Sequence, residues 1–200
     1  MKVAEARFIT SATTADGIPR DGVPHVALVG RSNVGKSSLL NAMTRTTLAR
    51  TSAAAGKTRL ANLYRVTVDG GPGGPGQWSL YFADLPGYGY ARGGRESVVE
   101  LKKIAEAYFS GDHPVAAVLQ LVDARHPGLD ADLEAARWLS ALGVERAALA
   151  TKIDKLSQRE RTKNLRELER QLGTAALPVS AASGEGLDDL WTLIARLTRR

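Results

Sequence analysis

The eight residues GRSNVGKS, at positions 30–37, constrain the fold of this 200-residue chain more than any other stretch. They match the pattern G-x-x-x-x-G-K-[S/T]. They follow the apolar run HVALVG (25–30) and precede apolar positions at helical spacing, Leu39, Leu40 and Met43. A buried strand, a glycine-rich turn and a helix form the context in which this pattern cradles phosphates. The stretch therefore predicts a nucleoside triphosphate site in a P-loop fold.

The residue types of this loop predict how the phosphates are held. Gly30 and Gly35 let the backbone turn tightly, so that successive N–H groups point at phosphate oxygens near a helix N-terminus. Lys36 would place a positive charge on the β- and γ-phosphates, and Ser37 would offer its hydroxyl to Mg²⁺. The predicted phosphate-loop contacts are Gly30, Arg31, Ser32, Asn33, Val34, Gly35, Lys36, Ser37 and Ser38.

Short apolar runs alternate with amphipathic stretches, which is typical of an α/β fold with a mostly parallel sheet and helices on both faces. The loop DGGPGGP (69–75) joins two neighbouring strands and predicts one antiparallel edge strand. We interpret the chain as a single domain (1–200), with an N-terminal extension (1–23) packed on it. The predicted strands are six, at 25–30, 62–69, 77–84, 115–123, 146–151 and 175–180.

Two helices are predicted in the C-terminal part of the chain. Ser157 and Glu160 form a capping-box pattern, which indicates a helix N-terminus. The apolar face of this helix would be Leu165, Leu168 and Leu172, and that of the last helix Leu187, Leu190, Trp191, Ile194 and Leu197. Trp138 and Trp191 are interpreted as core residues.

Two motifs indicate guanine as the base. TKID (151–154) follows a predicted strand, where Asp154 could accept both N1–H and N2–H₂ of guanine; adenine has no matching N1 donor. The stem of Lys152 could lie over the base or brace the phosphate loop. SAA (180–182) ends the last strand, where the N–H of Ala181 could donate to guanine O6. The predicted guanine contacts are Thr151, Lys152, Ile153, Asp154, Ser180, Ala181 and Ala182.

AGKT (55–58) and DLPG (84–87) are predicted to be the two nucleotide-sensing segments. Thr58 would complete the Mg²⁺ shell once a γ-phosphate is present. Asp84 would reach the metal through water, and the amide of Gly87 would face the γ-phosphate. Catalytic roles are thus assigned to Lys36, Thr58 and Gly87, and metal contacts to Ser37, Thr58 and Asp84. The remaining predicted nucleotide contacts are Gly56, Lys57, Leu85 and Pro86.

Tyr88 follows DLPG at the position where Ras-like switches carry a Gln that orients the attacking water. No other obvious side chain is available for this task, so we expect slow hydrolysis by the isolated protein.

The chain carries 27 Lys and Arg against 21 Asp and Glu, a net charge of +6. This excess favours polyanionic partners such as nucleic acid, although many soluble domains of this charge bind none. For Arg92 and Arg95, RNA phosphate contact and simple solvation both remain open. Five cations between Arg159 and Arg170 are interspersed with Glu160, Glu167 and Glu169, which favours a solvated helix face.

Composition excludes several other functions. The absence of cysteine rules out disulfides, thiolate catalysis and Cys-ligated zinc. His25, His113 and His126 share no metal-ligand spacing and are interpreted as incidental. No apolar run approaches the roughly 20 residues of a membrane helix, and residues 1–11 lack the apolar core of a secretory signal. We therefore expect a cytoplasmic protein without a membrane span.

Several motifs together resemble one known family, and they extend over nearly the whole chain. The chain is similar to the EngB (YihA/YsxC) GTPases, bacterial ribosome-biogenesis factors among the TrmE-Era-EngA-EngB-septin-like GTPases. Tyr88 is the residue that this family normally carries after DLPG, and Thr151 also agrees with its usage. Arg59 and the 69–75 loop depart from the commoner family pattern. The shared stretches are ARFITSA (6–12), GRSNVGKSSLLNA (30–42), AGKTRLANLY (55–64), DLPGYGYA (84–91), LVDARHPGLDADLEAARWL (121–139), TKIDK (151–155) and SAASGEGLDDL (180–190).

The resemblance implies a Ras-like fold, GTP and GDP as ligands, and Mg²⁺-dependent GTP hydrolysis. It also implies action on the large (50S) ribosomal subunit, through rRNA and ribosomal proteins, and a part in bacterial septation; we expect a monomer. Related GTPases with Asn at the place of Asn33 can hold K⁺ beside the phosphates, and the other interpretation is that Asn33 only stabilises the turn.

Two other classes of function are alternatives to this one. A metabolic P-loop enzyme, such as a small-molecule kinase, requires neither TKID nor SAA nor a switch Thr58. A division scaffold that uses GTP only to hold its shape would show no ribosome association.

Overall fold

The computed structural model describes residues 1–49, 61–70, 74, 76–88 and 95–198. For residues 95–101 it describes the backbone alone. The strands of its sheet lie in the order β1-β3-β4-β2-β5-β6-β7. Their bounds are β1 Lys2–Ala12, β2 His25–Gly30, β3 Ala61–Asp69, β4 Gln77–Asp84, β5 Val115–Asp123, β6 Arg146–Thr151 and β7 Ala176–Pro178.

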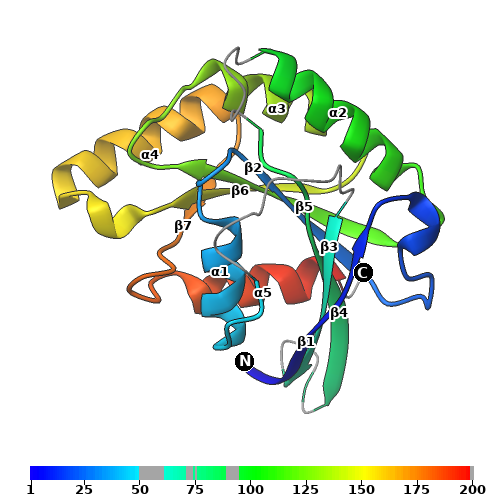
Figure 1. Cartoon of the computed structure of the whole chain (residues 1–200). Coiled ribbons are helices and arrows are strands. Elements are labelled where there is room, and N and C mark those ends of the chain that lie inside the picture. Colours follow the sequence, from blue (N-terminus) through cyan, green and yellow to red (C-terminus); the bar gives the residue numbers. More distant parts are fainter. Residues whose placement is uncertain (50–60, 71–73, 75, 89–94, 199–200) are drawn as a thin grey trace.

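Helices cover both faces of this sheet, as Figure 1 shows. One face packs against α1 (Lys36–Thr44) and α5 (Leu187–Thr198), and the other against α2 (Arg95–Phe109), α3 (Asp130–Ser140) and α4 (Gln158–Leu172). The alternation of β2 explains the two cores, because Val26 and Leu28 face α1 and α5 while Ala27 and Val29 face the opposite layer.

The predicted α/β class is confirmed, but the strand count and the edge were wrong. Over the described residues the sheet has seven strands rather than six, because β1 pairs with β3 along its length. The antiparallel β3 therefore lies inside the sheet, and β1 takes the edge. Register shifts after Val3 and after Phe8 break the alternation of β1, so its sequence does not show a period of two.

Other local predictions are confirmed. Ser157 and Glu160 form a complete capping box at the start of α4. Leu168 and Leu172 of α4 are buried, and Trp191 of α5 is buried against Trp78 and Phe82. The last strand is shorter than expected, because it ends at Pro178 and leaves Ser180 in the following turn. No helix in the described part of the chain is long and apolar enough to cross a membrane.

Candidate functional site

The predicted site residues that the structure describes meet where the parallel strands of the sheet end. The strands β4, β2, β5 and β6 run parallel, so that Gly30, Asp84, Asp123 and Thr151 stand at four neighbouring carboxyl ends. β2 continues directly into the phosphate loop and α1. Ligands of open α/β sheets bind outside the carboxyl ends of such strands.

The phosphate loop depends on glycine where it enters α1. Gly35 has φ 113°, a left-handed conformation that side chains rarely adopt, and no atom crowds the position of a Cβ there. Asn33 also has positive φ, at 62°, which Asn tolerates better than most residues. These two left-handed residues turn the loop from β2 into the N-terminus of α1.

The end of the segment DLPG contacts the phosphate loop at Ser32. The amide of Ser32 donates to the carbonyl of Tyr88 at 2.7 Å, and its hydroxyl donates to the carbonyl of Gly87 at 3.2 Å. A Cβ on Gly87 would lie 2.8 Å from the nitrogen of Ser32 and 2.9 Å from Nζ of Lys36. Only glycine fits between these groups.

Ser37 and Asp84 offer the ligands for a divalent cation. The hydroxyl of Ser37 lies 3.4 Å from Oδ2 of Asp84, whereas the buried Oδ1 has no hydrogen-bond partner among the described residues. Burial raises the pKa of Asp84 and lowers that of Lys36, although each charge counteracts the shift of the other. A buried carboxylate oxygen without a donor beside a serine hydroxyl fits Mg²⁺, which prefers hard oxygen ligands.

The guanine motifs lie side by side. The hydroxyl of Ser180 donates to Oδ1 of Asp154 at 2.7 Å, and this hydrogen bond lowers the pKa of Asp154. The same serine oxygen accepts from the amide of Ala182 at 3.2 Å, while the amide of Ala181 has no acceptor among the described residues. The carboxylate is thus oriented and ionised, with a free N–H close by.

Thr151 and Lys152 connect this pocket to the phosphate loop. The hydroxyl of Thr151 lies 2.9 Å from the carbonyl of Val34, and Nζ of Lys152 donates to the carbonyl of Asn33 at 2.7 Å. The structure therefore brings the two motifs together across more than one hundred residues. Thr151 acts here through the loop backbone, and Ile153 is buried among the apolar residues under α4.

Asp123 and Arg125 belong to this cluster, and sequence reasoning missed them. The guanidinium of Arg125 donates to both carboxylate oxygens of Asp123, at 2.9 and 2.8 Å, and Nζ of Lys152 lies 2.9 Å from Oδ2. Burial acts to raise the pKa of Asp123, but the hydrogen bonds from Arg125 and Lys152 hold it well below its usual range. A carboxylate at the carboxyl end of the apolar strand 115–123 was the available signal.

The side chain of Tyr88 points away from the phosphate loop and into the core. It is 1% exposed within the core under α2 and α3, and its hydroxyl donates to Oδ1 of Asp132 on α3 at 2.7 Å. Gln120 of β5 donates to the backbone carbonyl of Asp132 at 2.8 Å. Tyr88 therefore anchors the end of DLPG, at Gly87, to the body of the protein.

Part of the predicted site lies outside the described residues. Gly56, Lys57 and Thr58 fall in 50–60, Arg92 falls in 89–94, and the side chain of Arg95 is not described. Pro86 and the buried Leu85 connect Asp84 to Gly87, and Ser38 follows Ser37 in α1. Arg31 lies beside Tyr88, with which it forms an isolated parallel bridge.

Known proteins resemble this chain in sequence and in fold. Residues 25–152 match the model of the family described as "50S ribosome-binding GTPase". A probable GTP-binding protein EngB of Anaeromyxobacter sp. (strain Fw109-5) is 42% identical over 199 residues, covering 98% of this chain and 92% of that protein. The one from Chlorobaculum tepidum is 40% identical over the full length of both chains.

Solved structures agree at the level of the fold. The crystal structure of a probable GTP-binding protein EngB superposes with a TM-score of 0.59 at 18% identity, covering 88% of this chain and 98% of that one. A GDP form of the cytosolic domain of the T. maritima FeoB iron transporter gives 0.60 at 24% identity, covering 89% and 64%. The likeness in sequence, over nearly the whole length of the relatives, shows that the chain belongs to the EngB family of GTP-binding proteins, which are GTPases with a ribosome-binding GTPase domain.

Proposed function

We propose that this protein binds GTP and hydrolyses it slowly, with Mg²⁺, as a molecular switch in the assembly of the large ribosomal subunit. The observation that carries the proposal is the guanine pocket, in which Ser180 orients Asp154 while Lys152 connects the pocket to the phosphate loop. Such an arrangement favours guanine because its N1–H and N2–H₂ groups could both donate to the ionised carboxylate of Asp154, whereas adenine has no N1 donor.

The residues of the site divide the work between binding and orientation. Loop amides from Gly30 to Ser38 would hold the phosphates at the N-terminus of α1, and Lys36 would neutralise their charge. Ser37 and Asp84 would hold Mg²⁺, with Thr58 added in the GTP state. Bound Mg²⁺ would supply charge stabilisation for phosphoryl transfer. Gly87 would present its amide to the γ-phosphate.

Hydrolysis by the isolated protein should be slow, because the side chain of Tyr88 is committed to Asp132 in the core. Asn33 offers a way to compensate. Its side chain is exposed beside the phosphate loop and could hold K⁺ there. Its left-handed backbone equally supports a role in the turn alone. The two roles differ in whether turnover responds to the monovalent cation.

Family membership supports the large ribosomal subunit as the partner, through rRNA and ribosomal proteins. We further propose that the protein acts as a monomer of one domain in the bacterial cytoplasm, and that its function affects septation. The alternative is a GTP-dependent division scaffold that does not act on ribosomes; the basic charge of the chain favours the ribosome.

Cosedimentation with purified large ribosomal subunits tests this function. We expect binding that differs between a non-hydrolysable GTP analogue, GDP and no nucleotide. Association that is absent in all three states would favour the scaffold. Tight GTP and GDP binding without any acceptor substrate would separate both from a small-molecule kinase.

A further inference from the structure

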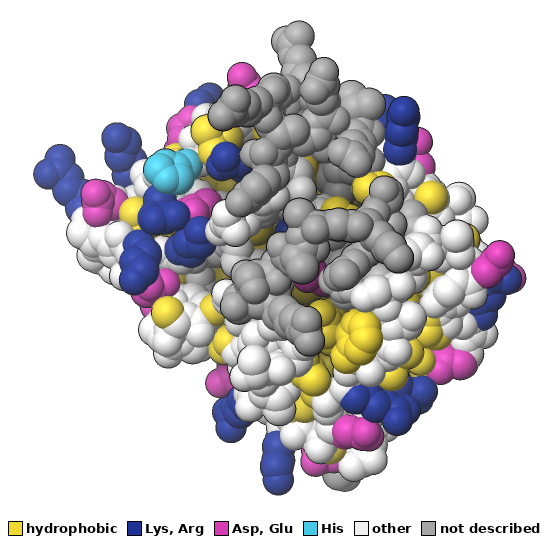
Figure 2. Space-filling model, in the orientation of Figure 1, with side chains coloured by type: hydrophobic (Ala, Val, Ile, Leu, Met, Phe, Trp, Pro, Cys, Tyr) yellow, Lys and Arg dark blue, Asp and Glu magenta, His cyan; other side chains and the backbone are white. Residues whose placement is uncertain are grey.

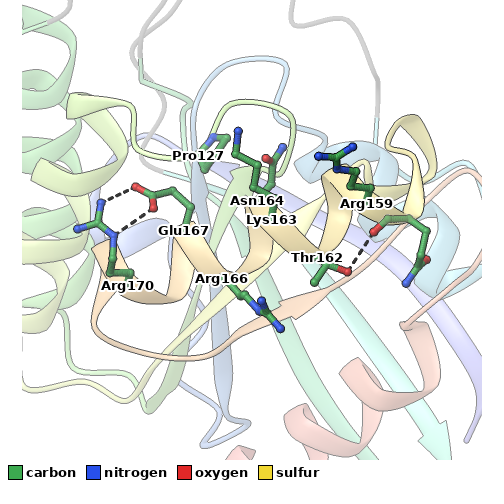
Figure 3. Close-up of a pocket in the computed structure, with 9 residues that line it drawn as sticks. Pro127, Arg159, Thr162, Lys163, Asn164, Arg166, Glu167 and Arg170 are labelled. Carbon is green, nitrogen blue, oxygen red and sulfur yellow. Dashed lines mark hydrogen bonds and ion pairs between the residues drawn. The ribbon is translucent and has the colours of Figure 1, made fainter.

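A groove of about 1040 Å³ runs along α4, and no residue of the phosphate loop lines it. One wall is Pro127, in the loop after β5, and the other is the exposed surface of α4, as Figure 3 shows. The lining side chains are those of Pro127, Gln158, Arg159, Thr162, Lys163, Asn164, Arg166, Glu167 and Arg170. None of the mechanism proposed above uses this groove.

Four exposed cations form a stripe along the groove. Arg159, Lys163, Arg166 and Arg170 are spaced i, i+4, i+7 and i+11, which places them on one face of the helix. At 1.5 Å per residue the stripe is about 16 Å long. Figure 2 shows dark blue Lys and Arg side chains gathered over the part of the molecule where Figure 1 places α4.

Of the four cations in this stripe, Arg170 is paired with an acidic residue of α4 in the described part of the chain. Glu160 is used by the capping box with Ser157, and Glu167 pairs with Arg170 at 2.6 Å. Among the described residues no ion pair is formed by Arg159, Lys163 or Arg166. Three positive charges therefore face solvent without an ion pair to a described residue. This agrees with the solvated helix face that the sequence favoured, although the interspersed glutamates do not pair with these three cations.

The two walls of the groove are fixed to each other. The side chain of Asn164 donates to the carbonyl of Ala124 at 2.9 Å, where the loop leaves β5. Gly128 has φ 84°, and a Cβ there would lie 2.2 Å from the side chain of Gln171. The loop thus packs closely on α4, and a ligand would meet a preformed groove that costs little ordering on binding.

The chemistry of the lining fits a phosphate backbone better than a protein or unpaired bases. The groove offers guanidinium, ammonium, amide and hydroxyl donors and one carboxylate, that of Glu167, which is paired with Arg170; its lining has no aromatic ring. Protein interfaces depend on buried aromatic anchors, and single-stranded RNA depends on stacking platforms. Double-stranded RNA is recognised mainly through shape, phosphates and 2′-hydroxyls, which these donors can contact.

We propose that this groove is a docking surface for the phosphate backbone of double-stranded RNA, with Arg159, Lys163 and Arg166 each contacting a phosphate. The inference rests on the proposed function in that the RNA would be a helix of the large subunit rRNA. Because the three cations read charge and not bases, binding is sequence-independent and strongly salt-dependent.

The test compares two variants of equal charge. The first is R159Q/K163Q/R166Q, and the control is K103Q/R137Q/R196Q, whose exposed cations lie on other helices and form no ion pair with described residues. Both variants lower the net charge from +6 to +3. Their affinities for two RNA duplexes of unrelated sequence, and for polyglutamate, are measured between 50 and 200 mM salt, after thermal melting and GDP binding confirm that both fold.

Each phosphate contact contributes about 0.7–0.9 to the slope of log affinity against log salt. Three contacts predict that wild-type affinity for either duplex falls about 20- to 40-fold more than that of the stripe variant over this fourfold salt range. The control should follow the wild type. Equal losses in both variants, preference for one duplex, or tighter binding of polyglutamate than of RNA would overturn the proposal.

Large subunits provide the second arm of this test. If the wild type binds duplexes through the stripe but large subunits in no nucleotide state, the proposed function fails and the groove stands as an RNA surface. If the stripe variant cosediments with large subunits as well as the control does, the groove is not the docking surface on rRNA.

Discussion

Replacing Tyr88 by Phe should destabilise the protein in a pH-dependent way and leave GTP hydrolysis nearly unchanged. The ring would keep its place in the core, and the 2.7 Å hydrogen bond to Asp132 would be lost. The other carboxylate oxygen of Asp132 already has no hydrogen-bond partner among the described residues. Tyr88→Phe therefore leaves this buried carboxylate without a side-chain donor.

The pH dependence follows from Asp132. Burial raises its pKa to about 6 from an ordinary value of 3.8, and the hydrogen bond from Tyr88 opposes that rise. A raised pKa means that Asp132 contributes stability which is fully present below pH 4 and is lost as the pH rises through about 6. Removing the Tyr88 hydroxyl raises the pKa further, so the deficit of the variant grows above pH 6.

The size of the effect can be set from the two forms of the hydrogen bond. At pH 8 the bond to a carboxylate should be worth about 1.5–3 kcal/mol, and at pH 5, with Asp132 mostly protonated, about 0.5–1.5 kcal/mol. Urea unfolding at both pH values measures this difference. Tyr88→Ala is a poorer choice, because emptying a buried aromatic site costs about 3–5 kcal/mol by itself.

Tyr81→Phe is the matched control. Its hydroxyl donates to Asp21 at 3.0 Å, but that carboxylate stays partly exposed and also pairs with Arg65. We expect a loss of at most about 1 kcal/mol with little dependence on pH. A Tyr88→Phe variant as stable as this control at pH 8 would refute the reasoning. A loss of hydrolysis beyond a few-fold in single turnovers would make the hydroxyl part of the chemistry.

Three further predictions concern the nucleotide site. Asp154→Asn should weaken GTP and GDP and improve binding of xanthosine nucleotides, whose C2 carbonyl accepts the new amide; titration with both nucleotide families checks this, and an unchanged guanine preference would contradict the pocket. Asn33→Ala should abolish a stimulation of single-turnover hydrolysis by KCl over NaCl, whereas a wild type indifferent to the cation would leave Asn33 its turn role only. Asp123→Asn should weaken GDP binding about 10-fold or more, because Lys152 loses the charge that holds it. The control Asp16→Asn removes an exposed carboxylate that pairs with Arg20, and it should leave GDP affinity unchanged.

The nucleotide motifs were predictable because their information is local. GRSNVGKS specifies the end of a strand at Gly30, a left-handed residue at Gly35 and a helix start at Lys36 within eight residues. Ser157 with Glu160 specifies a helix start within four. In each case the backbone has few other ways to satisfy the same chemistry. The order of GRSNVGKS, TKID and SAA along the chain was enough to indicate guanine.

The tertiary structure decided the contacts between residues far apart in the chain. The sequence could not show that Tyr88 turns toward Asp132, 44 residues away, or that Asp123 holds both Arg125 and Lys152. It also hid β1, whose irregular alternation gives no periodic signal until β3 lies beside it. These outcomes depend on which elements pack together. Packing also decides which charges form ion pairs; among the described residues, none is formed by Arg159, Lys163 or Arg166.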